Sequence, residues 1–367
     1  MPRRGSLPQP RLRLGSLHAD PTGPRKASDA FDVTPQIPDT FQALVATQRG
    51  HEVDRTLTAI GREQLPDSEV TIRVSWSSIN YKDALAVSPD GNVAQISPLI
   101  PGIDLAGEVV EDLSGNLEPG RPVLVHGYGL GVSHHGGFAE YARVPAEWVV
   151  PMPSGLQSRD AMILGTAGFT AALSVLALEH AGLTPEQGPV LVAGAMGGVG
   201  CVAVQLLAQR GYEVWASTGK PDAEWLLDLG AAGLLTREET SQSSTRPLER
   251  QRWAGCVDPV GGSTTGYAVR TTRYGGAVAL SGLTGGVDID LTVHPFILRG
   301  VSVLGIDSVQ TPVSRRQEVW QRLATDMRPH RLEELGVREI ALSDVAATLG
   351  TVAAGLGRGR TIVNVAP

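Results

Sequence analysis

The chain has 367 residues, of which 42% are hydrophobic and 19% charged. This length exceeds one ordinary domain, so we expect two, and the apolar content excludes global disorder. The formal net charge of −7 argues against a nucleic-acid-binding protein. The chain has only two cysteines, Cys201 and Cys256. That number excludes a disulfide scaffold and a four-cysteine zinc site, and it is typical of a reducing compartment, which predicts a cytoplasmic protein.

Residues 1–40 differ from the rest of the chain. They contain seven prolines and six basic residues without apolar periodicity, which predicts a disordered tail. Two uncharged stretches farther on, residues 161–178 and 188–209, are long enough to cross a membrane. Both contain several glycines, and the first lacks flanking basic and aromatic residues. We therefore expect neither stretch to enter a membrane.

From residue 41 to about residue 160, the pattern is that of a compact β domain. Short stretches rich in Val, Ile and Thr alternate with prolines and glycines, which is typical of strands joined by turns. The expected strands are residues 41–47, 70–76, 107–111 and 122–126.

Beyond residue 164, strands alternate with helices, which predicts a parallel, doubly wound sheet. The expected strands are residues 189–193, 212–217, 255–258, 277–280 and 301–305, and the expected helices are residues 198–210 and 222–229. Helices at 313–326 and 343–354 precede a last strand, residues 361–365, which could return to the first domain. We thus predict an α/β fold with a tail at 1–40, a first domain of residues 41–164 and 306–367, and a second of residues 165–305.

Residues 190–200 place glycines directly between a strand and a helix. Gly194 allows the tight turn, Gly197 lets the backbone approach a pyrophosphate, and Gly200 lets the helix pack on the strand. The helix N-terminus offers free N–H groups and a partial positive charge to an anion. These features predict a dinucleotide site. Its predicted loop residues are Gly194, Met196, Gly197, Gly198, Val199 and Gly200.

The end of the next strand predicts which dinucleotide binds. An NAD site usually carries an acid there to bind the ribose hydroxyls, but no acid occurs before Asp222. Ser217 and Thr218 can donate to a 2′-phosphate, and Lys220 can neutralise it. The predicted cofactor is therefore NADPH.

Three histidines could suggest a metal site. His126, His134 and His135 lie close in sequence, but Glu140 is the only nearby carboxylate and no cysteine precedes Cys201. We therefore expect no bound metal. Alcohol oxidation without zinc lacks its Lewis acid, whereas reduction of an activated C=C bond needs no metal, because the adjacent carbonyl accepts the developing charge.

The segment Asn80-Tyr81-Lys82-Asp83 resembles a motif of the zinc-free quinone-oxidoreductase branch of the medium-chain dehydrogenase/reductase superfamily. Further motifs, in the same order, are similar to the acrylyl-CoA reductase family within that branch. They are residues 134–140, 165–171, 295–299, 305–309 and 359–361, while residues 101–107 are similar to the next strand of the branch as a whole. The resemblance covers residues 41–366. It departs from the family at Met196, where a small or hydroxyl residue is usual, and at Lys220, which replaces the commoner arginine.

This resemblance implies a GroES-like catalytic domain beside a Rossmann domain that binds NADPH, and reduction of acryloyl-CoA to propionyl-CoA. It implies that Tyr81 contacts the nicotinamide and could relay a proton, with Asp83 orienting Tyr81 or Lys82. The implied catalytic residues are Asn80, Tyr81, Asp83 and Arg360. Tyr81, Leu283 and Arg360 are also implied to bind the cofactor.

Two other functions stay open at this point. One is an NADPH-dependent quinone or alkenal reductase of the same fold, and the other is a catalytically silent NADPH-binding protein. A CoA substrate would need basic residues, for which Arg270, Arg273 and Arg299 are candidates. Finally, the uncharged strand at 301–305 is a plausible sheet edge and, with the pairing usual in the superfamily, predicts a homodimer.

Overall fold

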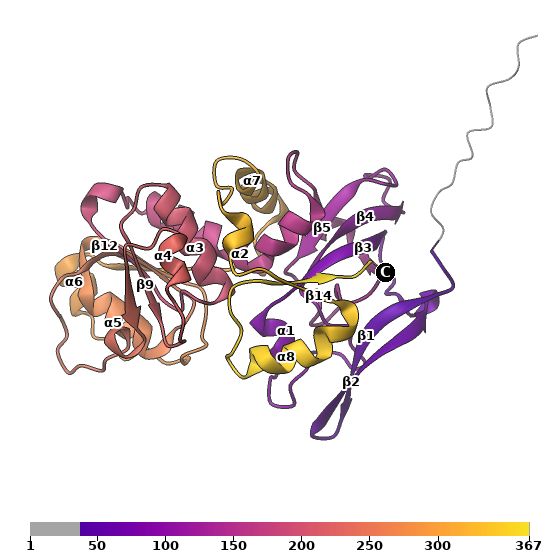
Figure 1. Ribbon diagram of the computed structural model, residues 1–367, viewed down its shortest axis with the longest axis horizontal. Helices are drawn as coiled ribbons and strands as arrows, with labels where there is room; N and C mark the ends of the chain where they lie inside the picture. Colours follow the sequence, from indigo (N-terminus) through magenta and orange to yellow (C-terminus); the bar gives the residue numbers. More distant parts are fainter. Residues whose placement is uncertain (1–36, 367) are drawn as a thin grey trace, which may run out of the picture. The chain divides into compact units, whose positions relative to one another are not determined.

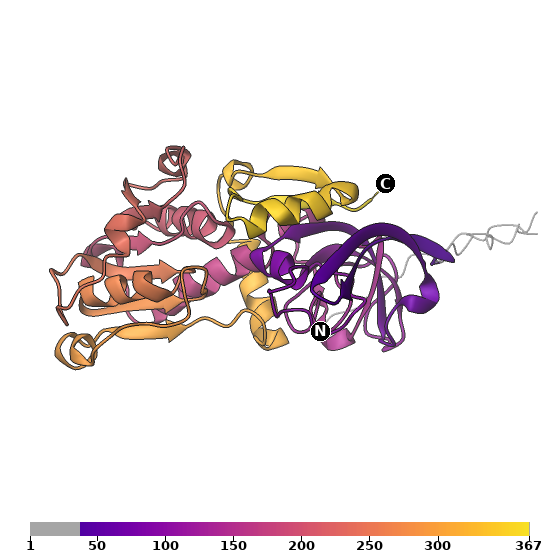
Figure 2. The ribbon, with the colours of Figure 1, turned by 90° about the horizontal axis from the view of Figure 1, so that it is seen from below.

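The computed structural model describes residues 37–366 (Figure 1), so the predicted tail lies outside the described residues except for positions 37–40. Strands β1 (Thr40–Arg49) and β2 (Glu52–Gly61) form an antiparallel hairpin (Figures 1 and 2). The sequence pattern predicts β1 but does not predict β2. Nearly all residues of β2 are exposed or half-buried, so the strand lacks the apolar alternation that would mark it.

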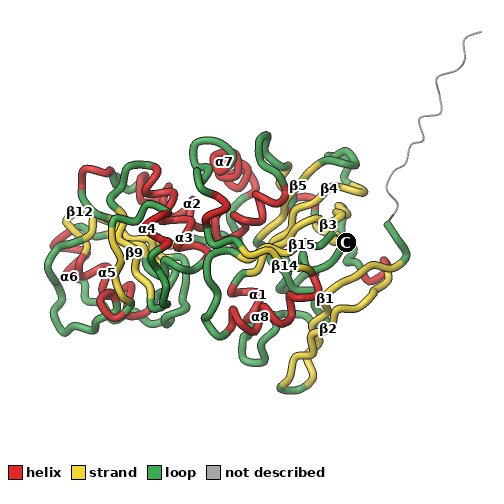
Figure 3. Tube along the Cα trace, viewed as in Figure 1, coloured by secondary structure: helices red, strands yellow, loops and turns green. Residues whose placement is uncertain are grey.

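A seven-stranded sheet forms the first body of the fold, with the order β14-β15-β3-β4-β5-β7 and with β6 pairing with β3 (Figure 3). Its strands are β3 (Val70–Ile79), β4 (Asp104–Asp112), β5 (Pro122–His126), β6 (Tyr141–Val144), β7 (Val150–Pro151), β14 (Arg338–Ala341) and β15 (Thr361–Asn364). Strand β15 runs antiparallel to β3, with Thr361 opposite Ile79. This pairing confirms that the last predicted strand returns to the first domain.

A six-stranded parallel sheet forms the second body, in the order β10-β9-β8-β11-β12-β13. Its strands are β8 (Val190–Val192), β9 (Val214–Thr218), β10 (Gly233–Thr236), β11 (Trp253–Asp258), β12 (Thr272–Leu280) and β13 (Ser302–Gly305). The predicted doubly wound sheet is confirmed, and so is the position of β13 at its edge. Because all strands are parallel, their carboxyl ends lie along one edge of the sheet.

The helices connect these strands. They are α1 (Tyr81–Ala86), α2 (Ser158–His180), α3 (Gly198–Gln209), α4 (Trp225–Asp228), α5 (Gly262–Thr271), α6 (His294–Arg299), α7 (Val313–Leu323) and α8 (Val345–Ala353). Short 3-10 turns cover Arg62–Gln64, Ala146–Trp148, Pro185–Gln187, Glu238–Thr240, Leu332–Glu334 and Leu342–Asp344. Helix α4 is shorter than the predicted helix 222–229, because Asp222 takes a left-handed conformation with φ of 55°.

Helix α2 packs against both sheets. It contacts β3, β4 and β5 of the seven-stranded sheet, and α3, β11 and β12 of the other body. Of the helices in residues 37–366, α2 is the one long and apolar enough to cross a membrane by length and composition, and 78% of its apolar window is buried inside the fold. This burial on all sides explains why its sequence is apolar around the whole helix and why periodicity does not reveal it.

The division into domains follows the two sheets. We propose residues 41–164 with 306–367, and residues 165–305, as the two domains. All strands of the six-stranded sheet fall between residues 190 and 305, while the seven-stranded sheet uses residues 70–151 and 338–364. The first proposed boundary coincides with a kink in α2 at Gly165, where φ is 52° and ψ is −159°.

One buried arginine fixes the connection between the two bodies. The guanidinium of Arg316 in α7 donates to the carbonyls of Thr311 (2.9 Å), Val309 (2.6 Å) and His126 (2.8 Å). It also lies 4.2 Å from the ring centroid of Tyr128. Arg316 is fully buried, and burial lowers its pKa. The side chain therefore ties the linker after β13 to the end of β5.

We predict that Arg316→Met destabilises the protein by about 3 kcal/mol or more, because the substitution leaves several buried carbonyls without donors. Urea unfolding followed by circular dichroism measures this change. The matched control is Arg315→Met. Arg315 is half-buried and forms a 2.5 Å ion pair with Glu318, so its loss should cost about 0–1 kcal/mol. Equal losses in the two variants would contradict a clamping role for Arg316.

Candidate active site

The Asn80–Asp83 motif forms the first turn of α1. The backbone N–H of Asn80 donates to Asp83 Oδ2 at 2.7 Å, and the N–H of Ile103 donates to Asp83 Oδ1 at 2.8 Å. Asp83 is fully buried, and burial, followed by the nearby charge of Asp104, raises its pKa to about 7. Asp83 thus fixes the start of α1 to the chain just before β4.

Asp104, at the start of β4, is the acceptor at the centre of a buried polar network. Its Oδ2 accepts hydrogen bonds from Ser78 Oγ (2.5 Å) and Asn80 Nδ2 (2.8 Å). Its Oδ1 accepts from Thr166 Oγ1 at 2.6 Å, and the Thr166 backbone N–H lies 3.0 Å from both oxygens. The kink at Gly165 makes this approach possible, since a Cβ there would lie 2.4 Å from Asp104 Oδ2.

Arg360, which directly precedes β15, enters the same network. Its Nη2 donates to Ser78 Oγ at 2.9 Å, its Nη1 to Asn80 Oδ1 at 3.4 Å, and its Nε to the Ile163 carbonyl at 2.7 Å. Only 2% of Arg360 is exposed. Burial lowers its pKa, while the charge of Asp104 opposes that shift. The structure therefore brings Asn80, Asp83 and Arg360 together, as the sequence predicts.

The glycine loop lies against the same arginine. A Cβ on Gly198 would lie 2.8 Å from Arg360 Nη1, and the N–H of Gly359 donates to the Met196 carbonyl at 2.9 Å. Gly194 has φ of 56°, as the predicted tight turn requires. A Cβ on Gly200 would lie 2.5 Å from the Gly194 carbonyl oxygen. Close backbone approach thus requires glycine at these positions.

Helix α3 begins at Gly198, and no side chain within residues 37–366 caps its first turn. The N–H groups of Gly198, Val199 and Gly200 therefore remain available to an anion, because the first amides of a helix have no partner within it. They also carry the positive end of the helix dipole. This cradle fits the pyrophosphate of a dinucleotide.

The residues predicted at the end of β9 separate into two groups. Ser217 is buried, and its hydroxyl bonds to Thr240 Oγ1 at 2.5 Å, so this side chain supports the sheet. The Thr218 hydroxyl accepts the Lys220 backbone N–H at 3.1 Å, and Lys220 Nζ donates to the Gly357 carbonyl. Burial, and then the charge of Arg237, lowers the pKa of Lys220.

Arg237 is a cation that the sequence analysis missed. It follows β10, the strand beside β9, and its backbone N–H donates to the Thr218 carbonyl at 2.9 Å. A Cβ on Gly219 would lie 3.0 Å from Arg237 Nε. Because parallel strands end at the same edge, a basic residue at the end of the next strand is the signal that could have identified Arg237.

Tyr81 and Leu283 lie at exposed positions. Tyr81 is 39% exposed in the first turn of α1, and its hydroxyl has no hydrogen-bond partner in the part of the chain that the structure describes. Leu283 is 58% exposed in the loop after β12, where a Cβ on Gly261 would lie 3.1 Å from its Cα. Tyr81 therefore has a free hydroxyl next to the buried network.

Each of the three histidines has a ring nitrogen in a protein contact, and Ile100 N–H donates to His135 Nδ1 at 3.3 Å, while His134 Nε2 is buried without a partner among the described residues. Trp320 Nε1 donates to His126 Nε2 at 2.8 Å, and the guanidinium of Arg316 lies 2.9 Å from His126 Nδ1. His134 Nδ1 lies 2.9 Å from the His135 carbonyl. Residues 37–366 hold no group of three His, Cys, Asp or Glu side chains placed to bind a metal ion. The positive charge of Arg316 beside His126 would repel a metal cation. That the protein binds no metal stays a prediction.

Both cysteines are buried free thiols. Burial raises the pKa of Cys201 to about 12 and that of Cys256 well above its usual value. Neither thiol is therefore a thiolate at neutral pH, which is the form that binds metal or reacts.

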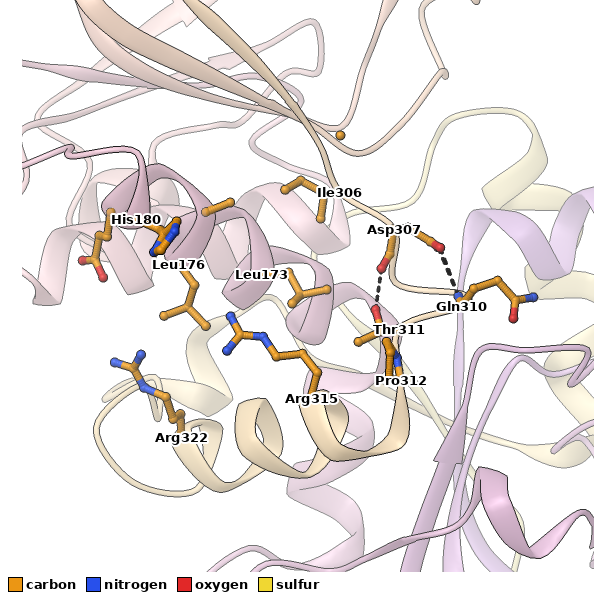
Figure 4. A pocket seen from close by; sticks show the side chains of 13 residues that line it. Leu173, Leu176, His180, Ile306, Asp307, Gln310, Thr311, Pro312, Arg315 and Arg322 are labelled. Carbon is orange, nitrogen blue, oxygen red and sulfur yellow. Dashed lines mark hydrogen bonds between the residues drawn. The ribbon is translucent and has the colours of Figure 1, made fainter.

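The cavities and the arginines considered for CoA lie apart from this network. A cavity of about 670 Å³ lies between α2 and α7, and Arg315 points from α7 toward Leu173 and Leu176 (Figure 4). Another, of about 700 Å³, is lined by Arg273. Arg270 pairs with Glu249 at 2.9 Å, and Arg299 and Arg273 donate to backbone carbonyls. These three arginines support the fold through such bonds.

The sequence matches two known families. Residues 66–154 match the family described as alcohol dehydrogenase GroES-like domain, and residues 198–325 match zinc-binding dehydrogenase. The putative quinone oxidoreductase YhfP of Bacillus subtilis is 47% identical over 326 residues, covering 89% of this chain and 99% of the relative. Acrylyl-CoA reductase AcuI of Ruegeria pomeroyi is 45% identical over 329 residues, with coverage of 89% and 99%.

Solved structures agree with these relatives. The chain is similar to Bacillus subtilis yhfP with NAD bound, with a TM-score of 0.86, 47% identity and coverage of 89% and 99%. It is equally similar to the yhdH oxidoreductase of Salmonella enterica in complex with NADP, with a TM-score of 0.86, 44% identity and coverage of 89% and 100%. The two structures hold different nicotinamide cofactors, so the choice between them depends on the residues of this chain.

The buried carboxyl of Asp83 makes a pH-dependent prediction. Its pKa of about 7 lies above the value of about 3.9 in the unfolded chain, so the folded protein binds more protons between these values. This group therefore lowers stability as pH rises from 4 to 8, by up to about 4 kcal/mol. Urea unfolding across this range should show that Asp83→Asn abolishes this contribution. Asp90→Asn, at an exposed position, is the control, and parallel pH profiles for parent and Asp83→Asn would contradict the prediction.

Proposed function

This chain belongs to the acrylyl-CoA reductase family, a branch of the medium-chain dehydrogenase/reductase superfamily, and we propose that it reduces the C=C bond of acryloyl-CoA with NADPH to give propionyl-CoA. The observation that carries this proposal is the buried network of Asn80, Asp104 and Arg360 against the glycine loop at Gly198. Tyr81, which directly follows Asn80, has a hydroxyl without a hydrogen-bond partner among the described residues, and this supports a role for Tyr81 at the bound cofactor.

The choice of NADPH rests on charge at the end of β9. Lys220 and Arg237 lie together there, and neither forms an ion pair with a carboxylate among residues 37–366. The acid that is typical of NAD sites is missing from the end of the strand. The N–H groups at the start of α3 would hold the pyrophosphate. Thr218, Lys220 and Arg237 would hold the 2′-phosphate. When bound, NADPH supplies the hydride that adds to the β-carbon of the substrate.

Tyr81 is the proposed catalytic residue of this chain. Its exposed hydroxyl can donate to the thioester oxygen, where negative charge develops, or deliver a proton to the α-carbon. Asn80, Asp83 and Arg360 act as positioning residues. Asp83 fixes the first turn of α1, and Arg360 fixes the side chains of Ser78 and Asn80. In this proposal they orient the turn that carries Tyr81 toward the bound cofactor.

Steady-state kinetics test this function. The purified protein should reduce acryloyl-CoA with NADPH at a kcat/KM at least about tenfold above that for benzoquinone or a simple alkenal. Activity should survive exhaustive dialysis against a chelator, since the metal-binding side chains are engaged elsewhere. Faster turnover of benzoquinone or the alkenal would favour a quinone or alkenal reductase. No turnover with any of them, together with NADPH binding, would favour a catalytically silent protein.

The quinone reductase is the second candidate because the YhfP relative, described as a putative quinone oxidoreductase, shares 47% identity with this chain. Nothing in the buried network depends on a thioester. The two activities therefore differ in the substrate-binding surface and are separated by the substrate series above.

Tyr81→Phe tests the role of the hydroxyl. The substitution keeps the ring and its packing, so NADPH affinity and the melting temperature should barely change. If the hydroxyl relays the proton, kcat should fall by about 10² or more. Single-turnover rates with solvent isotope effects measure the step directly. A loss below about fivefold would remove Tyr81 from the proton-donating role, and Tyr81→Ala then shows whether its ring positions the cofactor.

The sheet edge at β13 and the exposed side chains of α6 support a homodimer as a further part of the proposal. Helix α6 exposes Phe296, Ile297 and Leu298, and an apolar surface beside an unpaired edge strand favours self-association. A single monomer mass in light scattering at micromolar concentration would refute the dimer. Two buried free thiols agree with a cytoplasmic location, which cell fractionation tests.

A further inference from the structure

Three cations from different parts of the chain meet near the end of β9. Lys220 follows β9, Arg237 follows β10, and Arg358 precedes β15. The charge of Arg237 contributes to the lowered pKa of Lys220, and Lys220 Nζ donates to the carbonyl of Gly357, the neighbour of Arg358. The ion pairs found within residues 37–366 include none of the three, nor the nearby acids Asp222 and Glu224. None of the three cations is therefore held in an ion pair among the described residues.

The segment Gly357–Arg360 runs along the dinucleotide cradle. At one end, the Gly357 carbonyl accepts from Lys220; in the middle, the Gly359 N–H donates to the Met196 carbonyl at 2.9 Å. At the other end, Arg360 reaches Ser78 and Asn80. The backbone of Arg358 is thus fixed on both sides, by the bond of Gly357 to Lys220 and by the bond of Gly359 to the glycine loop.

The side chain of Arg358 rests on an aromatic platform. Its guanidinium lies 4.9 Å from the ring centroid of Trp225, the first residue of α4, and the residue is exposed. The indole N–H of Trp225 is buried and has no acceptor among the residues that the structure describes. A guanidinium stacked on a ring keeps its N–H groups free in its own plane, where they can bind an oxyanion in a bidentate manner.

We propose that Arg358, held on Trp225, is a third cation that binds the 2′-phosphate of the cofactor, beside Lys220 and Arg237. The proposal rests on NADPH being the cofactor. A phosphate monoester carries close to two negative charges at neutral pH, which matches cations that form no ion pair with a carboxylate among the described residues. Lysine at position 220 provides only a point charge, whereas Arg358 provides the planar fork that favours phosphate.

The test uses 2′,5′-ADP and 5′-AMP, which differ by the 2′-phosphate, and isothermal titration calorimetry of the full-length protein. We expect Arg358→Ala to weaken 2′,5′-ADP binding by about tenfold or more, the effect of one lost charge-assisted hydrogen bond. Binding of 5′-AMP should change by less than about twofold. Arg358→Lys should restore part of the loss, and Trp225→Ala should weaken 2′,5′-ADP binding while Trp225→Phe keeps most of it.

Arg55→Ala is the matched control, because Arg55 lies exposed on β2, away from the cradle. Melting temperatures of the Arg358 and Arg55 variants should match the parent, so that a weaker Kd reports the site. Trp225 packs against the core, so Trp225→Ala is expected to lower the melting temperature, and Trp225→Phe is its control. Parent-like 2′,5′-ADP binding by Arg358→Ala would overturn the proposal, as would an equal loss for 5′-AMP. A parent that fails to bind 2′,5′-ADP would overturn both this role and the assignment of NADPH. Binding without turnover of acryloyl-CoA would overturn the proposed reaction and leave the role of Arg358 intact.

Discussion

The buried guanidinium of Arg360 is the contact on which the candidate site depends. Taking this charge out of water is costly, and the cost is offset only if its donors find partners and an anion lies nearby. Arg360 donates to Ser78, Asn80 and the Ile163 carbonyl. The negative charge comes from Asp104, which is linked to Arg360 through the hydroxyl of Ser78. Asn80, which accepts a hydrogen bond from Arg360, also precedes the first turn of α1. The hydrogen bonds of the buried arginine therefore also help to fix the position of Tyr81.

This constraint also explains the backbone around the network. Position 165 requires glycine, because its φ is 52° and a Cβ there would lie 2.4 Å from Asp104 Oδ2 and 2.8 Å from Arg360 Nη2. The break in α2 frees the N–H of Thr166, which then binds Asp104. A helix of the core is thus interrupted at the one position where its amide serves a buried carboxylate.

Much of this arrangement is readable from the sequence. The glycine loop, the alternating strands and helices, and the return of β15 to the first sheet follow from local patterns. Four features do not. Helix α2 is buried on all sides and β2 is almost wholly exposed, so neither shows an amphipathic period. Arg237 joins Lys220 only because β10 lies beside β9, and such neighbours are a property of the sheet order. The burial of Ser217, likewise, depends on Thr240 from another segment.

The late position of Arg360 in the chain has a consequence for synthesis on the ribosome. Its partner Asn80 lies 280 residues earlier, so the nascent chain carries Asp83 and Asp104 long before the guanidinium arrives. Until then β3 also lacks its neighbour β15, and Asp104 has its hydroxyl and amide donors but not the nearby positive charge of Arg360. The network around Arg360 therefore cannot assemble until synthesis of the chain is almost complete. Incomplete chains released from stalled ribosomes would lack this network and would hold neither cofactor nor substrate.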